Sequence, residues 1–276
     1  MADMPYREVK SHRQIAIAQT LKQRVNHRVC RFEIFVGACL CELTDNESFD
    51  ASQPSVKMKI IEHTFGAVDC FRNILNEEYD IFFLVGGTQT NKTVIGAVLR
   101  PYEAVIAAHT GHICVHETGA IENNGHKVIH CPSPDGKVTP EMIRSVMDTH
   151  SSEHMVVPRL VYISNTTEVG TVYTREELST LRSVCDTHGL LLYCDGARLG
   201  SAMTIKGADT TFADYAACCD AFTIGGTKNG LLFGEALVIT NAYMGTGFRH
   251  CMKQQGAILA KGRLLGVQFE AILKDG

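Results

Sequence analysis

Lys228 is the residue with the clearest chemical potential in this sequence. It lies in the turn 225–230, directly after the apolar run 221–224, so an amine follows a predicted buried strand with glycines around it. A lysine amine is nucleophilic only after it loses its proton, and partial burial favours that form because the ammonium ion loses hydration. The setting suits a lysine that forms a Schiff base, although a surface lysine in a glycine turn has the same local sequence.

Polar residues follow apolar runs at four other places in the chain. In open α/β sheets, ligands bind outside the carboxyl ends of the strands, because loops and helix N-termini converge there. We therefore expect one site built from five chain segments. The other four segments are Gly86, Gly87 and Thr88 after 81–85, His109 and His112 after 103–108, Asn165 and Thr166 after 159–164, and Asp195 after 190–194.

Each of these groups has a use if the ligand is an aromatic aldehyde that carries a phosphate. Gly86, Gly87 and Thr88 open a predicted helix, where backbone N–H groups, the helix dipole and a hydroxyl can hold the phosphate. The segment is not a P-loop, because the Gly-Lys-Ser/Thr ending is absent. Asp195 can pair with a pyridinium nitrogen and keep it protonated, which makes the ring an electron sink. In isolation, each feature is equally explained as a helix start or a cap.

Arg198 and His112 complete the predicted site. Arg198 comes three residues after Asp195, and its planar guanidinium suits a bidentate contact with an amino-acid carboxylate, while a surface arginine is the competing interpretation. His112 can place its imidazole over the ring. The spacing of His112 and His116 also suits a metal-binding helix face, but the His-Glu-x-x-His order and a third ligand are missing, so no metal is expected.

The elements that must position these residues alternate from residue 81 onward. Short apolar runs and helix-period segments predict an α/β fold, a mostly parallel seven-stranded sheet with helices on both faces. Thr174 and Glu177 predict a capping box, and Gly189 ends that helix. Further helices are expected over 91–100 and 254–273, the latter exposing apolar side chains unless it meets a partner. The predicted strands are 81–85, 103–108, 127–130, 159–164, 190–194, 221–224 and 235–240.

Composition excludes several classes of protein. The chain has 276 residues, of which 45% are hydrophobic and 20% charged, as in soluble globular proteins. A net charge of −4 argues against nucleic-acid binding and favours a protein whose ligand is a small molecule. Eleven cysteines without a signal-peptide pattern predict reduced thiols in a cytoplasmic protein. No apolar stretch approaches the roughly 20 residues of a membrane-spanning helix, and the basic segment 9–31 is interpreted as a solvated helix.

Four motifs occur in order along the chain: VGGTQTN from Val85, HTGHICVHETGAIENNGHK from His109, DGARLGSA from Asp195 and GGTKNG from Gly225. Together they resemble the threonine aldolase and β-eliminating lyase family of pyridoxal-phosphate enzymes, which have the aspartate aminotransferase type of fold. The resemblance runs from about residue 80 to the end of the sequence.

The resemblance implies a role for each residue of the predicted site. Lys228 would hold pyridoxal 5'-phosphate covalently, Asp195 would pair with its ring nitrogen, and Gly87 and Thr88 would bind its phosphate. His112 would stack on the ring, and Arg198 would take the carboxylate of a small amino-acid substrate. The resemblance also implies a homo-oligomer, either a dimer or a tetramer, whose active sites lie between subunits.

The reaction that the resemblance implies is aldol cleavage of a threonine-like β-hydroxy amino acid to glycine and an aldehyde. Cleavage needs a proton acceptor near the hydroxyl. Threonine aldolases commonly carry a histidine after the asparagine-threonine pair, but here Asn165 and Thr166 are followed by Thr167. Because threonine is a poor base, His112 or a water would have to serve, with Asn165 near the substrate. The alternatives are β-elimination or transamination with the same cofactor, or a catalytically impaired fragment.

Three parts of the chain are expected. Residues 1–50 form a segment that diverges from the family's usual opening, and residues 51–245 form the cofactor-binding large domain. Residues 246–276 begin a connecting helix to a small domain that is largely missing. We expect reduced or absent turnover as one consequence.

Overall fold

A computed structural model describes residues 66–75, 77–260 and 262–274 of the chain. The segment 1–50 and the basic segment 9–31 therefore lie outside the described residues. Of the helices that the structure describes, none is long and apolar enough to cross a bilayer. All eight cysteines in the described part of the chain are unpaired thiols.

Seven strands form one mixed sheet in the order β1-β7-β6-β5-β4-β2-β3. The strands β3, β2, β4, β5 and β6 run parallel, while β7 is antiparallel to both of its neighbours, β6 and β1. The predicted fold class is confirmed, and every predicted strand is present within one or two residues of its expected bounds. The strands are β1 (Asp80–Leu84), β2 (Glu103–Ala108), β3 (Lys127–Cys131), β4 (Val157–Ser164), β5 (Leu191–Asp195), β6 (Ala221–Gly225) and β7 (Glu235–Ile239).

The antiparallel strand β7 brings an unexpected residue to the edge of the sheet where ligands bind. Its first residue, Glu235, pairs with Gly225 at the end of β6 and with Leu84 at the end of β1. The parallel strands also end at this edge. Because β7 starts at this edge, its first residue, Glu235, lies at the same edge as the residues that follow the parallel strands.

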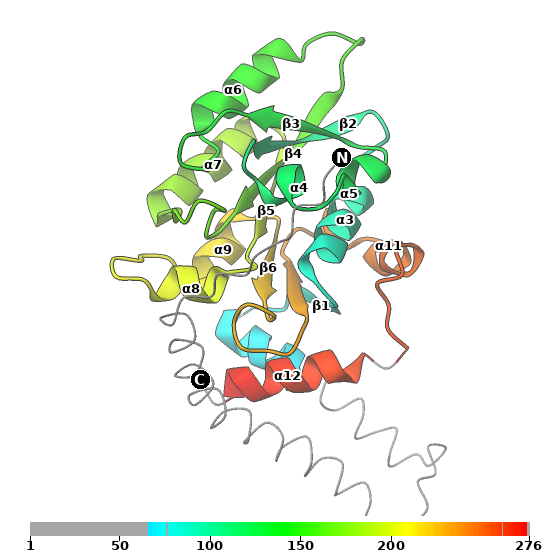
Figure 1. Ribbon diagram of the computed structural model, residues 1–276, viewed down its shortest axis with the longest axis vertical. Coiled ribbons are helices and arrows are strands. Elements are labelled where there is room, and N and C mark those ends of the chain that lie inside the picture. The colour runs from blue at the N-terminus through cyan, green and yellow to red at the C-terminus, as the bar shows by residue number, and fades with distance from the viewer. Residues whose placement is uncertain (1–65, 76, 261, 275–276) are drawn as a thin grey trace, which may run out of the picture. The chain divides into compact units, whose positions relative to one another are not determined.

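Helices cover both faces of the sheet (Figure 1), with α6, α7 and α9 on one face and α3, α4, α5 and α11 on the other. Alternate residues of β4 supply the two cores, because side chains of a strand point to opposite faces. Val161 and Ile163 join one core, and Leu160 and Tyr162 the other. The helices that the structure describes from end to end are α3 (Gly87–Val98), α4 (His112–Val115), α5 (Ala120–Asn123), α6 (Pro140–Thr149), α7 (Arg175–His188), α8 (Leu199–Thr204), α9 (Phe212–Cys218), α10 (Ala242–Gly245), α11 (Phe248–Gln254) and α12 (Arg263–Lys274).

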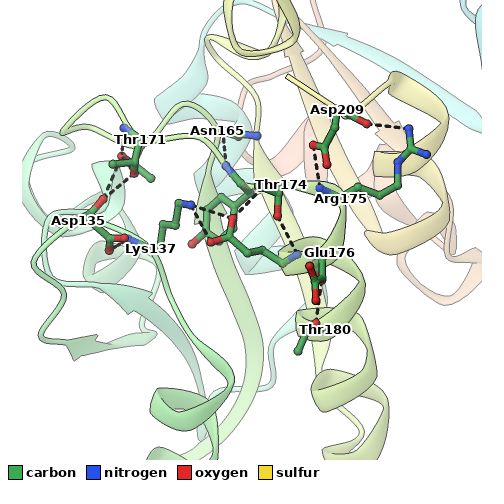
Figure 2. Close-up of polar contacts among 12 residues, drawn as sticks. Asp135, Lys137, Asn165, Thr171, Thr174, Arg175, Glu176, Thr180 and Asp209 are labelled. Atoms are coloured by element: carbon green, nitrogen blue, oxygen red, sulfur yellow. Dashed lines mark hydrogen bonds and ion pairs between the residues drawn. The ribbon is translucent and has the colours of Figure 1, made fainter. Parts of the chain in front are cut away.

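Helix α7 begins and ends as its sequence predicts. The Thr174 hydroxyl accepts from the Glu177 backbone N–H at 3.2 Å, and the Glu177 carboxylate accepts from the Thr174 N–H at 2.8 Å. At the other end, Gly189 adopts a left-handed conformation with φ of 64°. Figure 2 shows this helix start, where Arg175 also contacts Asp209. The helix predicted over 91–100 is also present, beginning earlier, at Gly87, and ending at Val98.

The prediction of one helix over 254–273 is wrong. Helix α11 ends at Gln254, and Gly256 takes a left-handed φ of 69°, which only glycine adopts readily. The N–H of Ala257 then bonds back to Met252 at 2.7 Å, a helix-ending turn, before α12 begins at Arg263.

The expected apolar exposure of this region is also corrected in part. Leu265 and Phe269 of α12 are buried, and the Phe269 ring lies 5.6 Å from that of Phe71 and 5.3 Å from that of Phe83. One stripe of α12 therefore packs into the core beside β1. Leu264 remains 55% exposed.

Candidate active site

Two residues of the predicted site, Asp195 and His112, lie close together at the carboxyl edge of the sheet. Asp195 ends β5 and is buried. Its Oδ2 accepts hydrogen bonds from the Tyr162 hydroxyl at 2.8 Å and from Asn91 Nδ2 at 2.8 Å, and its Oδ1 accepts from the Ala197 N–H at 3.0 Å. A carboxylate has about four acceptor positions. Three donors leave Asp195 one position for a further donor, such as a ring N–H.

Asn91 is the centre of the buried network, and sequence analysis did not identify it as a site residue. Its Nδ2 donates to Glu117 Oε1 at 2.7 Å as well as to Asp195, and its Oδ1 accepts from the Tyr193 hydroxyl at 2.8 Å. Asn91 lies on α3 one turn after the Gly86–Gly87 helix start. Its position as the last residue of the VGGTQTN motif was the available signal.

His112 is oriented by Glu117. Its Nδ1 lies 2.8 Å from Glu117 Oε1, and the Glu117 side chain has no exposed surface. This hydrogen bond raises the pKa of His112 against the opposing effect of burial, and the charges of Glu117 and Asp195 add to the rise. The imidazole is therefore fixed in orientation and favours its charged form.

Ligand atoms of His112, Glu117 and Asp195 all lie within 4.8 Å of one another, a grouping that also occurs in metal sites. In this protein the Asn91 amide donates to both carboxylates at 2.7 and 2.8 Å. An N–H donor between two carboxylates performs the bridging that a cation would otherwise perform. The donor set therefore fits an organic ligand better than a metal ion.

The Gly86–Gly87 turn leaves space at the start of α3. A Cβ built on either glycine would meet nothing within 4 Å. The first N–H groups of a helix have no partner within the helix, and the helix dipole favours an anion there. Thr88 is exposed in the same turn, while Thr90 is buried and its hydroxyl donates back to the Gly86 carbonyl at 2.9 Å. The open space and the unpaired donors fit a phosphate group.

The Lys228 turn is attached to the segment that follows Asp195. Asn229 Nδ2 donates to the Gly225 carbonyl at 2.7 Å and to the Ala197 carbonyl at 3.2 Å. A Cβ on Gly225 would overlap the Ala197 carbonyl oxygen, so glycine is required for this contact. Lys228 is exposed, and its charge opposes the rise in the pKa of His112 and of Glu235.

Two carboxyls of the site, those of half-buried Glu168 and buried Glu235, were not found by sequence analysis. Burial raises the pKa of Glu235 to about 7, and the charge of Asp195 adds to the rise. Burial also raises the pKa of Glu168, whose Oε1 accepts from the Ser164 hydroxyl at 2.9 Å. The Oε2 atoms of both residues are buried without a hydrogen-bond partner among the described residues. Nothing in the local sequence distinguishes them from surface glutamates.

The remaining predicted residues are placed differently. Arg198 is half-buried at the start of α8. Asn165 is fully buried, its Nδ2 donates to the Tyr215 hydroxyl, and its Oδ1 accepts from the Tyr173 N–H at 3.4 Å. The Asn165 amide therefore holds a loop in place, and its contact with substrate stays a prediction.

The chain is similar in sequence to proteins of known function. The family model described as Beta-eliminating lyase matches residues 62–268. A low specificity L-threonine aldolase of a Pseudomonas species is 35% identical over 215 residues, which are 77% of this chain and 62% of that protein. One from Saccharomyces cerevisiae is 30% identical over 182 residues, 63% of this chain and 45% of that protein.

The chain is also similar to proteins whose structures have been solved. The structure of Leishmania major threonine aldolase is 51% identical with a TM-score of 0.76, covering 77% of this chain and 63% of that chain. The structure of Bna3p from Saccharomyces cerevisiae, at 16% identity and a TM-score of 0.59, shares the fold. The chain spans less than two thirds of the length of these relatives.

Proposed function

Because the chain belongs to the beta-eliminating lyase family, as its motifs predicted, we propose that it binds pyridoxal 5'-phosphate and cleaves β-hydroxy amino acids to glycine and an aldehyde. The curated relatives above are L-threonine aldolases, which supports this substrate class. The observation that carries the proposal is the attachment of the Lys228 turn to the segment after Asp195, through Asn229 and the Ala197 carbonyl at 3.2 Å.

Four features of the chain would hold the cofactor. Lys228 would bind the carbonyl carbon of the cofactor, and Asp195 its ring nitrogen. The Gly86–Gly87 turn with Thr88 would bind the phosphate, and His112 would lie against the ring. When bound, the cofactor supplies a conjugated ring that accepts the electron pair released when a bond to Cα breaks.

The residues of the chain then orient the substrate. Arg198 would bind the α-carboxylate through its planar guanidinium. Asp195, held by three donors, would keep a proton on the ring nitrogen. His112, held by Glu117 at 2.8 Å, would maintain its ring in a single orientation. These restraints cost no reorganisation during reaction, as preorganised sites require.

The test is an ultraviolet-visible spectrum of the purified chain with pyridoxal phosphate, followed by borohydride reduction and peptide mapping. We expect an absorption band that is lost in Lys228→Ala and retained in Lys206→Ala, an exposed lysine. The reduced adduct should map to Lys228. An adduct at another lysine would overturn the site assignment.

Product analysis identifies the reaction. Glycine and an aldehyde from threonine or phenylserine would support aldol cleavage. A keto acid with ammonia would show β-elimination, and a keto acid with an aminated cofactor would show transamination. Cofactor binding without any product would support the impaired fragment.

We also propose that the chain acts as a homo-oligomer in the cytoplasm. Leu232, in the loop after Lys228, is 68% exposed, which suits burial against a second subunit. The unpaired cysteines fit a reducing compartment. Light scattering measures the oligomeric state.

The division of the chain into three parts remains a proposal, and limited proteolysis tests it. The parts are residues 1–50, a cofactor-binding domain over 51–245 and a following segment over 246–276.

A further inference from the structure

The proposed cleavage needs a group that takes the proton of the substrate hydroxyl, and two obvious residues do not suit this task. Thr167 is buried, its hydroxyl lies 2.7 Å from that of Thr171, and it also accepts from the Thr171 N–H at 3.0 Å. His112 is oriented by Glu117, which accepts its Nδ1 hydrogen at 2.8 Å, and its ring is assigned to the cofactor in the proposed function. Neither is a ready acceptor.

Glu168, the next residue along the chain, has the chemistry that Thr167 lacks. Its Oε1 is held by the Ser164 hydroxyl at 2.9 Å, while its Oε2 has no hydrogen-bond partner among the described residues. A buried carboxyl oxygen without a donor is uncommon in proteins and points to a missing ligand group. Ser164 also lies 3.3 Å from the Tyr162 hydroxyl, which donates to Asp195, so Glu168 is linked to the candidate site through two hydroxyl groups.

The hydrogen bonds around Ser164 accommodate Glu168 with or without a proton. Ser164 has one hydroxyl hydrogen and lies within reach of both Glu168 Oε1, at 2.9 Å, and the Tyr162 oxygen, at 3.3 Å. The Tyr162 hydrogen is given to Asp195. Ionised Glu168 receives the Ser164 hydrogen. Protonated Glu168 can donate to Ser164, which then donates to Tyr162, so the chain of hydrogen bonds to Asp195 is complete when Glu168 carries a proton.

The loop that carries Glu168 is held at several points. The Thr171 hydroxyl donates to the Asp135 carbonyl at 2.6 Å (Figure 2), and the Gly170 N–H bonds to the Thr167 carbonyl at 3.0 Å. Asn165, at the start of the loop, is fully buried. A base that must meet a hydroxyl in one geometry benefits from such restraint.

We propose that Glu168 is the catalytic base that accepts the hydroxyl proton of a β-hydroxy amino acid, an assignment that rests on the proposed function. The proton moves from the hydroxyl oxygen to the Glu168 carboxylate, and the electrons of that O–H bond form the carbonyl of the aldehyde. The Cα–Cβ bond breaks, and its electron pair stays on the Cα side until a proton completes glycine. No oxidant or reductant is needed.

The titratable groups that interact electrostatically with Glu168 come from three elements. They are His112 and Cys114 on α4, Tyr162 on β4 and Asp195 on β5. Burial raises the pKa of Glu168 as the largest effect, and the Ser164 hydrogen bond opposes the rise. A base with a pKa closer to neutrality transfers protons more efficiently at working pH.

The decisive experiment compares two reactions of the holoenzyme in Glu168→Gln. Cleavage of phenylserine needs a base at the hydroxyl, whereas exchange of the glycine α-proton with deuterium oxide does not. We expect kcat for cleavage to fall by about 100-fold or more, with glycine exchange and the cofactor spectrum within about twofold of wild type. The control Glu153→Gln changes an exposed glutamate and should alter neither reaction. Unchanged cleavage, or equal loss of both reactions, would overturn the assignment.

The pH profile and an infrared titration give independent readouts. Activity requires ionised Glu168, so wild-type kcat should fall as pH drops through its pKa, and Glu168→Asp should keep this acidic limb. In the cofactor-free protein, the carboxylic-acid band that titrates above the ordinary glutamate range should weaken in Glu168→Gln. An infrared spectrum unchanged by that substitution would contradict the proposal. If the wild-type chain takes up no cofactor and cleaves no β-hydroxy amino acid, the proposed function itself fails.

Discussion

The side-chain amide of Asn91 lies 2.8 Å from the carboxylate of Asp195, although 104 positions separate the two residues in the chain. The same amide nitrogen donates to Glu117 at 2.7 Å. One N–H₂ group therefore stands between two buried carboxylates and reduces their repulsion. Because Asn91 lies on the helix that begins at the Gly86–Gly87 turn, the candidate ring-nitrogen and phosphate positions are coupled through a single rigid element.

Replacing Asn91 with alanine should destabilise the fold. The variant leaves Glu117 and Asp195 buried without their shared donor, and loss of such a donor costs about 2 to 3 kcal/mol. Urea unfolding at neutral pH measures the change. Asn123→Ala is the matched control, because the Asn123 side chain is exposed and accepts a hydrogen bond from the Lys92 amine at 3.1 Å. Equal stability of the two variants would contradict a structural role for the Asn91 bridge.

Replacing Gly87 with alanine should weaken cofactor binding without destabilising the fold. A Cβ at Gly87 meets no protein atom within 4 Å, so the fold accepts it, but the methyl group enters the space assigned to the phosphate. We expect the Kd for pyridoxal phosphate to rise at least about tenfold, or about 1.4 kcal/mol, as measured by absorbance titration. The contrasting variant is Gly225→Ala, which overlaps the Ala197 carbonyl and should lower stability. Unaltered Kd in Gly87→Ala would count against the phosphate assignment.

Glu235 should make the stability of the cofactor-free protein depend on pH. Burial raises its pKa from 4.5 to about 7, so between these values the folded state holds a proton that the unfolded chain releases. The stability contributed by Glu235 is complete below pH 4.5 and is lost as pH rises through about 7.

The size of this change in stability follows from the shift in the pKa of Glu235. Glu235→Gln keeps a neutral side chain at all pH values, so its stability relative to wild type should rise by about 3 kcal/mol between pH 5 and pH 8. Urea unfolding of both proteins at the two pH values gives this difference. Parallel pH dependence in wild type and variant would show that Glu235 does not carry the raised pKa.

Removing the Glu117 carboxylate should lower the pKa of His112. The Glu117 hydrogen bond is the largest cause of the raised value, and burial acts in the opposite direction. In Glu117→Gln, the pKa of His112 should therefore fall below that of the wild type, as measured by nuclear magnetic resonance titration of its ring protons. Glu122→Gln, an exposed substitution, is the control. A His112 pKa unaffected by Glu117→Gln would refute the hydrogen bond as its cause.

Much of the fold is readable from local patterns in the sequence. Apolar runs and capping residues act over a few positions, which is why all seven strands and the α7 capping box of Thr174 and Glu177 were predicted. The same reasoning selected Lys228 and Asp195 as candidates, because Asp195 ends β5 and Lys228 comes three residues after the end of β6, at the edge where ligands bind in such sheets. The prediction over 254–273 was wrong because periodicity alone does not register the left-handed turn at Gly256.

The partners of these residues depend on strand order and register, which no local pattern contains. Insertion of β7 between β6 and β1 in the antiparallel direction brings Glu235 to the ligand-binding edge. Packing of α3 against the sheet places Asn91 between Glu117 and Asp195. Burial and neighbouring charge, which distinguish Glu168 from a surface glutamate, exist only once distant segments have come together, because both are properties of the assembled environment and not of the residue type.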